Sequence, residues 1–259
     1  MHQALAAIAV DSNGRSSLLS NNSAVAILPA LSDPSPVVRS NAYDALLNFS
    51  SIRSGVDALV EAGYPNILVD KALKEADDVR HYPLQLLYNC IKNEDGLRAA
   101  LECDAVEACI KNLSHKDSLV KKDAAATLGF LCFADSAKVT AIDSGAVEIL
   151  SDLLDHHFWK VRSNSAQALM SIIQTDSGKK SIVKSGGIPL LIKLLKDENP
   201  LVTINVLKTI AAAAVHPQAR KEMRESPDCL PVIHNIIDGG DPLLSKHAKI
   251  AKEQVMWEP

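Results

Sequence analysis

Two stretches of the chain, SGAVEILSDLLDHHFWKV (Ser144–Val161) and SGGIPLLIKLLKDENPLV (Ser185–Val202), share one pattern of residues, 41 positions apart. In both, small residues precede an apolar run with helical spacing, and a polar segment then leads into a further apolar run. Self-similarity at a fixed period is the sequence signature of a repeat protein. The fold therefore depends on how far this period extends along the chain.

The period of 41 residues continues through the sequence in three series of positions. The first series is aliphatic and consists of Leu5, Leu46, Leu87, Leu128, Leu169, Ile210 and Ala251. The second is also aliphatic and consists of Val38, Val79, Val120, Val161, Val202 and Leu243. The third contains small residues, and we expect it to mark positions where the chain leaves a helix: Gly14, Gly55, Gly96, Ala137, Gly178 and Ala219.

Each repeat has the same internal order, which residues 146–186 illustrate. AVEILSDLL predicts a helix, WKVRSN a short helix or turn, and SAQALMSIIQ a longer third helix that the polar stretch TDSG ends. Residues 1–22 have the pattern of only the last part of a repeat. We therefore expect a partial repeat over 1–22 and six fuller repeats over about 23–63, 64–104, 105–145, 146–186, 187–228 and 229–259.

A repeat of this size cannot bury its own apolar face, whereas stacked repeats share one core. We therefore predict an all-α fold, a right-handed α-solenoid that forms a single domain over residues 1–259. Aromatic residues make up only 4% of the chain, so this core is expected to be aliphatic. Three lysines on the last predicted helix are expected to solvate an exposed end of the stack: Lys246, Lys249 and Lys252.

The sequence offers no constellation for chemistry. The five cysteines are scattered, and we interpret them as free thiols in a reducing compartment. His156 and His157 are adjacent, point in different directions and are expected in a solvated turn. No nucleotide-binding, hydrolase or metalloprotease motif occurs. We therefore expect a protein that is not an enzyme and that uses no metal, cofactor or small-molecule substrate.

Charge and hydropathy exclude two further classes of partner. The formal net charge of −4 gives no general reason to bind nucleic acid or an anionic membrane surface. No uninterrupted apolar run of about 18 residues exists, so no membrane-spanning helix is expected.

The three-helix repeat, its length, and the openings SGAVEILSDLL and SGGIPLLIKLL resemble the armadillo repeat over essentially the whole chain. The ending AKIAKEQVMWEP, the opening HQAL, and the run VRSNSAQALMSI followed by GIPLLIKLLKDE resemble the radial spoke head protein 14 family. This second resemblance implies a structural scaffold in the radial spoke of motile cilia or flagella, bound to other radial spoke proteins. It implies a location in the axoneme. The alternative is a soluble cytoplasmic adaptor that binds an extended partner peptide.

In armadillo folds the third helices line a concave face that holds extended peptides, and import receptors use a Trp followed four residues later by an Asn. The Asn positions here read Asn48, Asn89, Phe130, Ser171 and Ala212, with no Trp four residues earlier, which argues against recognition of nuclear localisation signals. Two interpretations stay open for Asn48 and Asn89: they hold a partner segment, or they only satisfy local groups and face water. The candidate groove residues are Asp44, Asn48, Gln85, Tyr88, Asn89, Gln167 and Lys208.

A further series is basic at four of its five positions: Arg39, Arg80, Lys121, Arg162 and then Thr203. We interpret these cations as partners of local carbonyls and acids at the junctions between helices. The alternative is a stripe that binds an acidic partner such as a tubulin tail.

Overall fold

The computed structural model describes residues 23–258, so the predicted partial repeat over residues 1–22 lies outside the described residues. The described chain is all-helical and contains no strand, as the sequence predicts. It divides into two compact parts, residues 1–127 (the N-terminal half) and residues 128–259 (the C-terminal half). That the chain forms one continuous domain stays a prediction.

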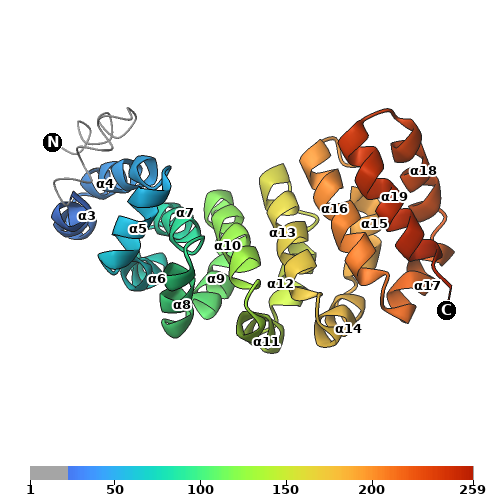
Figure 1. Ribbon diagram of the computed structural model, residues 1–259, viewed down its shortest axis with the longest axis horizontal. Helices are drawn as coiled ribbons and strands as arrows, with labels where there is room; N and C mark the ends of the chain where they lie inside the picture. Colours follow the sequence, from blue (N-terminus) through green and yellow to red (C-terminus); the bar gives the residue numbers. More distant parts are fainter. Residues whose placement is uncertain (1–22, 259) are drawn as a thin grey trace. The chain divides into compact units, whose positions relative to one another are not determined.

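The helices follow one another with the period of the sequence (Figure 1). The N-terminal half contains α3 Ser23–Ile27, the 3₁₀ helix η1 Leu28–Ser32, α4 Pro36–Phe49, α5 Arg53–Glu61, α6 Tyr64–Lys74, α7 His81–Cys90, α8 Glu94–Glu102 and α9 Ala105–Leu113. Helix α10 Ser118–Leu131 crosses the division. The C-terminal half continues with α11 Asp135–Asp143, α12 Ala146–Leu153, α13 Trp159–Ile172, α14 Asp176–Lys184, α15 Gly187–Leu194, α16 Pro200–Ala213, α17 Pro217–Glu225, α18 Cys229–Asp238 and α19 Pro242–Met256.

The order of helices inside a repeat differs from the predicted one. WKVRSN is not a separate element but the start of α13, because no Gly or Pro separates it from the apolar run that follows. The third element of this period is α14, a helix of nine residues that comes after the long one. From residue 64 onward, each repeat thus begins with a helix of 8 to 11 residues and continues with a helix of 10 to 15 residues. We keep the name third helix for the second of these, as in the sequence-based prediction. The third helices are α4, α7, α10, α13, α16 and α19.

A residue with positive φ stands immediately before the first helix of four successive repeats. The positions are Gly63, Asp104, Gly145 and Gly186, with φ of 77°, 59°, 73° and 72°. This left-handed conformation lets the chain reverse direction between two packed helices, and glycine adopts it without a Cβ clash. These residues recur every 41 positions, so the turn as well as the core follows the period of the sequence.

The final repeat starts one residue late. The next position in the positive-φ series is Pro227, and a proline ring excludes positive φ. The chain uses an extra residue here, so that α18 and α19 begin 42 residues after α15 and α16. The prediction that Leu243 continues the second aliphatic series is therefore wrong. Leu243 is 52% exposed and is the counterpart of Leu201, which is 53% exposed.

The series of small residues was predicted to mark positions where the chain leaves a helix, but its role is different. Gly178 does not end α13; it lies in the first turn of α14 and is buried. A Cβ there would lie 2.5 Å from the carbonyl oxygen of Ile172, near the end of α13. Glycine is needed at this position because one helix starts very close to the end of the previous one.

The first aliphatic series lies in the core, as predicted. The members in the described residues are fully buried: Leu46, Leu87, Leu128, Leu169, Ile210 and Ala251. Four of the five cysteines are also buried, and Cys103 is half-buried. Burial raises the pKa of the Cys90 and Cys132 thiols to about 12.

The last helix, α19, carries exposed lysines at positions where the preceding third helix carries buried aliphatic residues. Lys246 and Lys249 are exposed, and they occupy the positions that buried Ile204 and Leu207 take in α16. The register shift of 42 residues places them there. The prediction that lysines solvate this end is confirmed for both residues, while Lys252 is half-buried.

Replacing Leu169 by Ala should lower the free energy of unfolding by about 2–5 kcal/mol, because it leaves a cavity in the shared core. Leu201→Ala is the matched control on the neighbouring third helix and should change it by less than about 0.5 kcal/mol, because that side chain is exposed. Urea unfolding followed by circular dichroism measures both. Equal midpoints for the two variants would show that the repeat positions are assigned wrongly.

Replacing Gly186 by Ala should cost about 1 kcal/mol for conformational reasons alone, since nothing lies within 4 Å of the added Cβ. Asp104→Gly is the complementary variant and should retain or raise the melting temperature, because glycine relieves the same strain. Thermal melts of both proteins test the role of the positive-φ turn. A Gly186→Ala protein that melts like wild type would contradict it.

Candidate partner-binding groove

Successive third helices are joined by polar bonds as well as by the core. The hydroxyl of Thr209 on α16 donates to the carbonyl of Ala166 on α13 over 2.8 Å. The Asn205 amide nitrogen donates to the carbonyl and the hydroxyl of Ser163 at 3.1 and 3.0 Å. These bonds fix how α13 and α16 lie side by side in Figure 1. The outward side chains of the two helices are therefore held at a constant spacing.

A groove of about 370 Å³ lies along these two helices, and all its lining residues belong to the C-terminal half. Five lining residues stand at intervals of three or four along their helices, the spacing that keeps side chains on one helical face. On α13 the face carries Lys160, Asn164 and Gln167, and on α16 it carries Leu201 and Asn205. Trp159 and Ser163 complete the lining. The groove thus combines an aromatic and an aliphatic side chain with three amides.

Two of the predicted groove residues belong to this face. Gln167 lines the groove directly. Lys208 is half-buried and lies three residues after Asn205, on the same face of α16. Trp159, Asn164 and Asn205 were not predicted. Asn164 lies three residues before Gln167, and Asn205 lies 41 residues after Asn164. A search of the sequence in steps of 41 residues that starts at Asn164 would therefore have found both.

The other predicted groove residues lie in the N-terminal half, on the packed helices α4 and α7. The Asn89 amide donates to the Ser50 hydroxyl at 2.9 Å and accepts from the Lys92 ammonium at 3.1 Å. The same ammonium lies 4.3 Å from the centre of the Tyr88 ring. The amide of Asn89 is thus engaged within the chain, and binding of a partner to it stays a prediction.

The remaining predicted residues of this half differ in exposure. Gln85 is exposed, while Asn48 and Asp44 are half-buried. Burial raises the pKa of the Asp44 carboxyl, and nearby His81 opposes that rise.

A larger hollow of about 700 Å³ in the N-terminal half is lined by the segments that join α4 to α5 and α7 to α8. Two of its polar side chains bond to each other, since the Asn93 amide donates to Asp57 at 2.7 Å. Asn93 also accepts from the backbone N–H groups of Asp95 and Gly96 and so caps α8. These contacts hold together the segments that connect the helices. The hollow is therefore formed by helix ends, whereas the groove is formed by the outward faces of two long helices.

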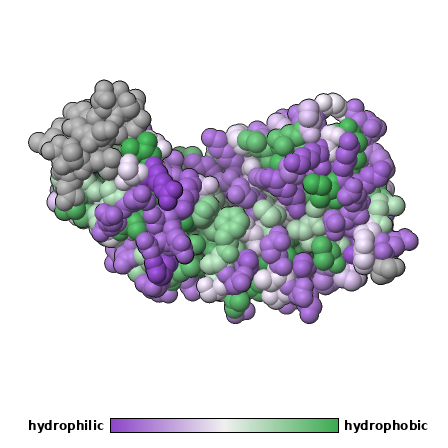
Figure 2. All heavy atoms as spheres, in the orientation of Figure 1, coloured by the Kyte–Doolittle hydropathy of each residue, from purple (hydrophilic) through white to green (hydrophobic). Residues whose placement is uncertain are grey.

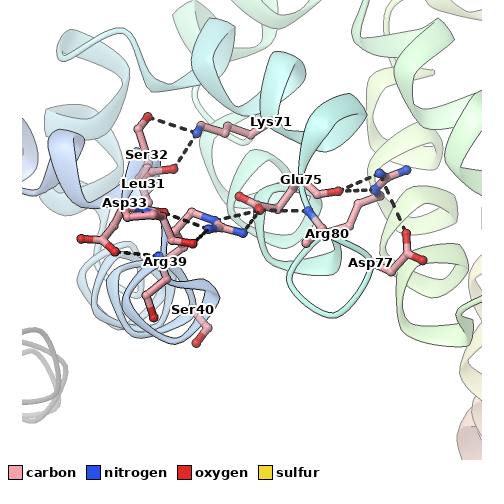
Figure 3. A network of polar contacts seen from close by, with 12 residues as sticks. Leu31, Ser32, Asp33, Arg39, Ser40, Lys71, Glu75, Asp77 and Arg80 are labelled. Carbon is pink, nitrogen blue, oxygen red and sulfur yellow. Dashed lines mark hydrogen bonds and ion pairs between the residues drawn. The ribbon is translucent and has the colours of Figure 1, made fainter.

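The basic series lies at the junctions between helices (Figure 3). Arg39 contacts the buried Glu75 carboxylate at 2.7 Å and donates to the Asp33 carbonyl at 2.8 Å. Arg80 donates to the carbonyl of Glu75 at 2.7 Å. In the C-terminal half, Arg162 pairs with Asp197 at 2.7 Å. Local pairing is therefore confirmed for these three arginines.

Arg162 joins three segments of the C-terminal half. Besides Asp197 in the next repeat, it donates to the carbonyls of His156 and His157, both at 2.9 Å. These two histidines thus lie in the turn before α13. Backbone carbonyls that follow a helix have no partner inside it and need hydrogen-bond donors from elsewhere. His157 is exposed, as predicted for a solvated turn, and His156 is half-buried.

Within residues 23–258, no group of three His, Cys, Asp or Glu side chains is arranged to hold a metal ion. Among the helices of the same part of the chain, none is both long and apolar enough to cross a bilayer.

Comparison with known proteins agrees with this architecture. Residues 175–211 match the family model of the armadillo/β-catenin-like repeat. An engineered protein from a structural genomics consortium is 26% identical with a TM-score of 0.81, and the match covers 90% of this chain and 96% of that one. A second engineered protein has a TM-score of 0.87 at 27% identity, over 99% of this chain and 64% of that one.

A designed armadillo repeat protein in complex with the peptide (KR)4 has a TM-score of 0.77 at 19% identity, over 89% of this chain and 98% of that chain. The fold is the armadillo-repeat solenoid. No curated protein matches the sequence.

Replacing Arg162 by Met should lower the free energy of unfolding by about 3 kcal/mol. The change leaves the Asp197 carboxylate, whose side chain is only 4% exposed, without its cation. Adding Asp197→Asn removes that buried charge and should recover part of the loss. Denaturant titration of both variants gives the values. A double variant that is less stable than Arg162→Met alone would contradict this account of the ion pair.

Proposed function

We propose that the chain is a non-catalytic scaffold that holds an extended segment of a partner protein in the groove between α13 and α16. The observation that carries this proposal is the composition of the groove, in which Trp159 and Leu201 lie beside the amides of Gln167 and Asn205. An extended segment has unpaired backbone donors and acceptors, and an amide side chain can bond to both. The two apolar side chains offer contact area for the segment's own side chains.

The position of Asn205 supports this role. Its nitrogen is fixed by the two bonds to Ser163, which orient the amide and reduce the entropy lost on binding. Its carbonyl oxygen is then an acceptor for a partner N–H group. The designed armadillo protein with a bound peptide supports this type of ligand for the fold, although its identity to this chain is only 19%.

The proposal extends to the cell structure in which the scaffold works. The resemblance of AKIAKEQVMWEP, at residues 248–259, and of VRSNSAQALMSI to the radial spoke head protein 14 family supports a structural subunit of the axonemal radial spoke. The partners would be other radial spoke proteins, and the location would be the axoneme of motile cilia or flagella. VRSNSAQALMSI lies within α13, so one of the segments that carry the resemblance also lines the groove.

A tagged chain in ciliated cells tests both levels of the proposal. After detergent extraction and a salt wash, the wild-type protein should stay with the axonemes and leave only together with radial spoke proteins. The double variant Gln167→Ala/Leu201→Ala should wash out, because it shortens two groove side chains. The fold should not change, since Gln167 is half-buried and Leu201 exposed.

The matched control is Val139→Ala/Gln174→Ala, which removes an exposed aliphatic and an exposed amide outside the groove. This protein should stay with the axoneme. A wild-type chain that washes into the soluble fraction would reject the spoke assignment and favour the soluble adaptor. If the groove variant is retained as well as its control, the groove is not the attachment site.

A further inference from the structure

We infer that the groove between α13 and α16 selects an acidic partner segment. The inference rests on the proposed function, in which this groove holds a partner segment, and it adds the charge of that segment. It depends on the distribution of lysines over the third helices of the C-terminal half and on which of them are already paired within the chain.

The charges of the whole chain and of these helices have opposite signs. The chain as a whole carries a formal net charge of −4. The three helices α13, α16 and α19 contain one acidic residue, Glu253, near the end of the last helix. Against it stand six basic residues: Lys160, Arg162, Lys208, Lys246, Lys249 and Lys252.

Two of these cations lie on the outward faces that form the groove. Lys160 lines it, with its ammonium 5.5 Å from the centre of the Trp159 ring. Leu201, Asn205 and Lys208 follow one another at intervals of four and three residues, so Lys208 extends the groove face of α16 by one turn. A segment in the groove therefore meets one lysine from each helix.

The charge of Arg162 does not add to this site, because Asp197 neutralises it at the helix junction. Lys160 and Lys208 differ from it, since both lie on faces that carry no carboxylate. Figure 2 shows that the visible surface of the C-terminal half is mainly hydrophilic, with only small hydrophobic patches. On this face, charge rather than a broad apolar surface is therefore the feature that can discriminate between partners.

The positive potential also affects a neighbouring side chain. His247 lies on α19, which packs against α16. Its pKa is lowered first by burial and then by the charges of Lys208 and Lys246. Lys208 thus lies within electrostatic range of another basic side chain, and an acidic ligand would relieve that repulsion.

An extended segment presents every second side chain to the same surface. Alternating carboxylates would therefore face the lysines while the backbone between them meets the amides of Gln167 and Asn205. A basic segment such as the (KR)4 peptide of the designed protein would meet like charge here.

Fluorescence anisotropy with the full chain and labelled peptides of about twelve residues tests the inference. The peptides alternate Ser with Glu, with Gln or with Lys. The Glu peptide should bind about ten-fold more tightly than the other two, and its affinity should fall as salt rises from about 0.05 to about 0.5 M. Lys160→Glu/Lys208→Glu should weaken binding of the Glu peptide about ten-fold, because two attractions become repulsions.

The control Lys180→Glu/Lys184→Glu changes the net charge equally on exposed positions of α14, outside the groove, and should bind like wild type. Equal affinity for the Gln or Lys peptide would overturn the inference and leave the proposed peptide groove intact. An unchanged affinity in Lys160→Glu/Lys208→Glu would likewise overturn it. If none of the three peptides binds, both the inference and the peptide groove fail.

Discussion

The packing of neighbouring third helices within each half, α4 on α7 and α13 on α16 on α19, is the interaction on which the rest of the structure depends. No single repeat encloses its aliphatic side chains, so Leu169 and Ile210 become fully buried only because their helices lie side by side. The polar bonds from Thr209 to Ala166 and from Asn205 to Ser163 then fix the relative position of the two helices. Apolar contact supplies most of the stability, and these bonds supply the register.

The groove is a consequence of the same packing. Once one face of α13 and α16 is buried, the opposite faces must point outward together, and their side chains repeat with the period of the core. Asn164 and Asn205 are equivalent positions on that outward face. A site built in this way needs no special loop, and its specificity depends on which residues occupy a few repeated positions. In the C-terminal half these include two lysines, Lys160 and Lys208.

The arginines show how tertiary contacts change the meaning of a charge. Arg39 and Arg162 belong to one series in the sequence, and each binds a nearly buried acid of the next repeat together with carbonyls of its own. Their charge is used to connect repeats. Lys208 has the same sign but is half-buried and follows the groove residue Asn205 by three positions, on the same face of α16. Position in the repeat thus decides whether a cation pairs inside the fold or lies on the outward face.

The sequence by itself determined the helical repeat, its length and its core, because burial of an aliphatic residue every 41 positions leaves a periodic pattern that needs no structure to detect. It also placed Gln167 on the outward face. It did not determine the joining of WKVRSN into α13, the close approach at Gly178 or the late start of the final repeat, because these depend on distances between helices. Nor did it show that Arg162 meets Asp197 of the next repeat. Only the tertiary structure decided these points, since a residue's charge is read from the sequence but its partner is set by the packing of neighbouring repeats.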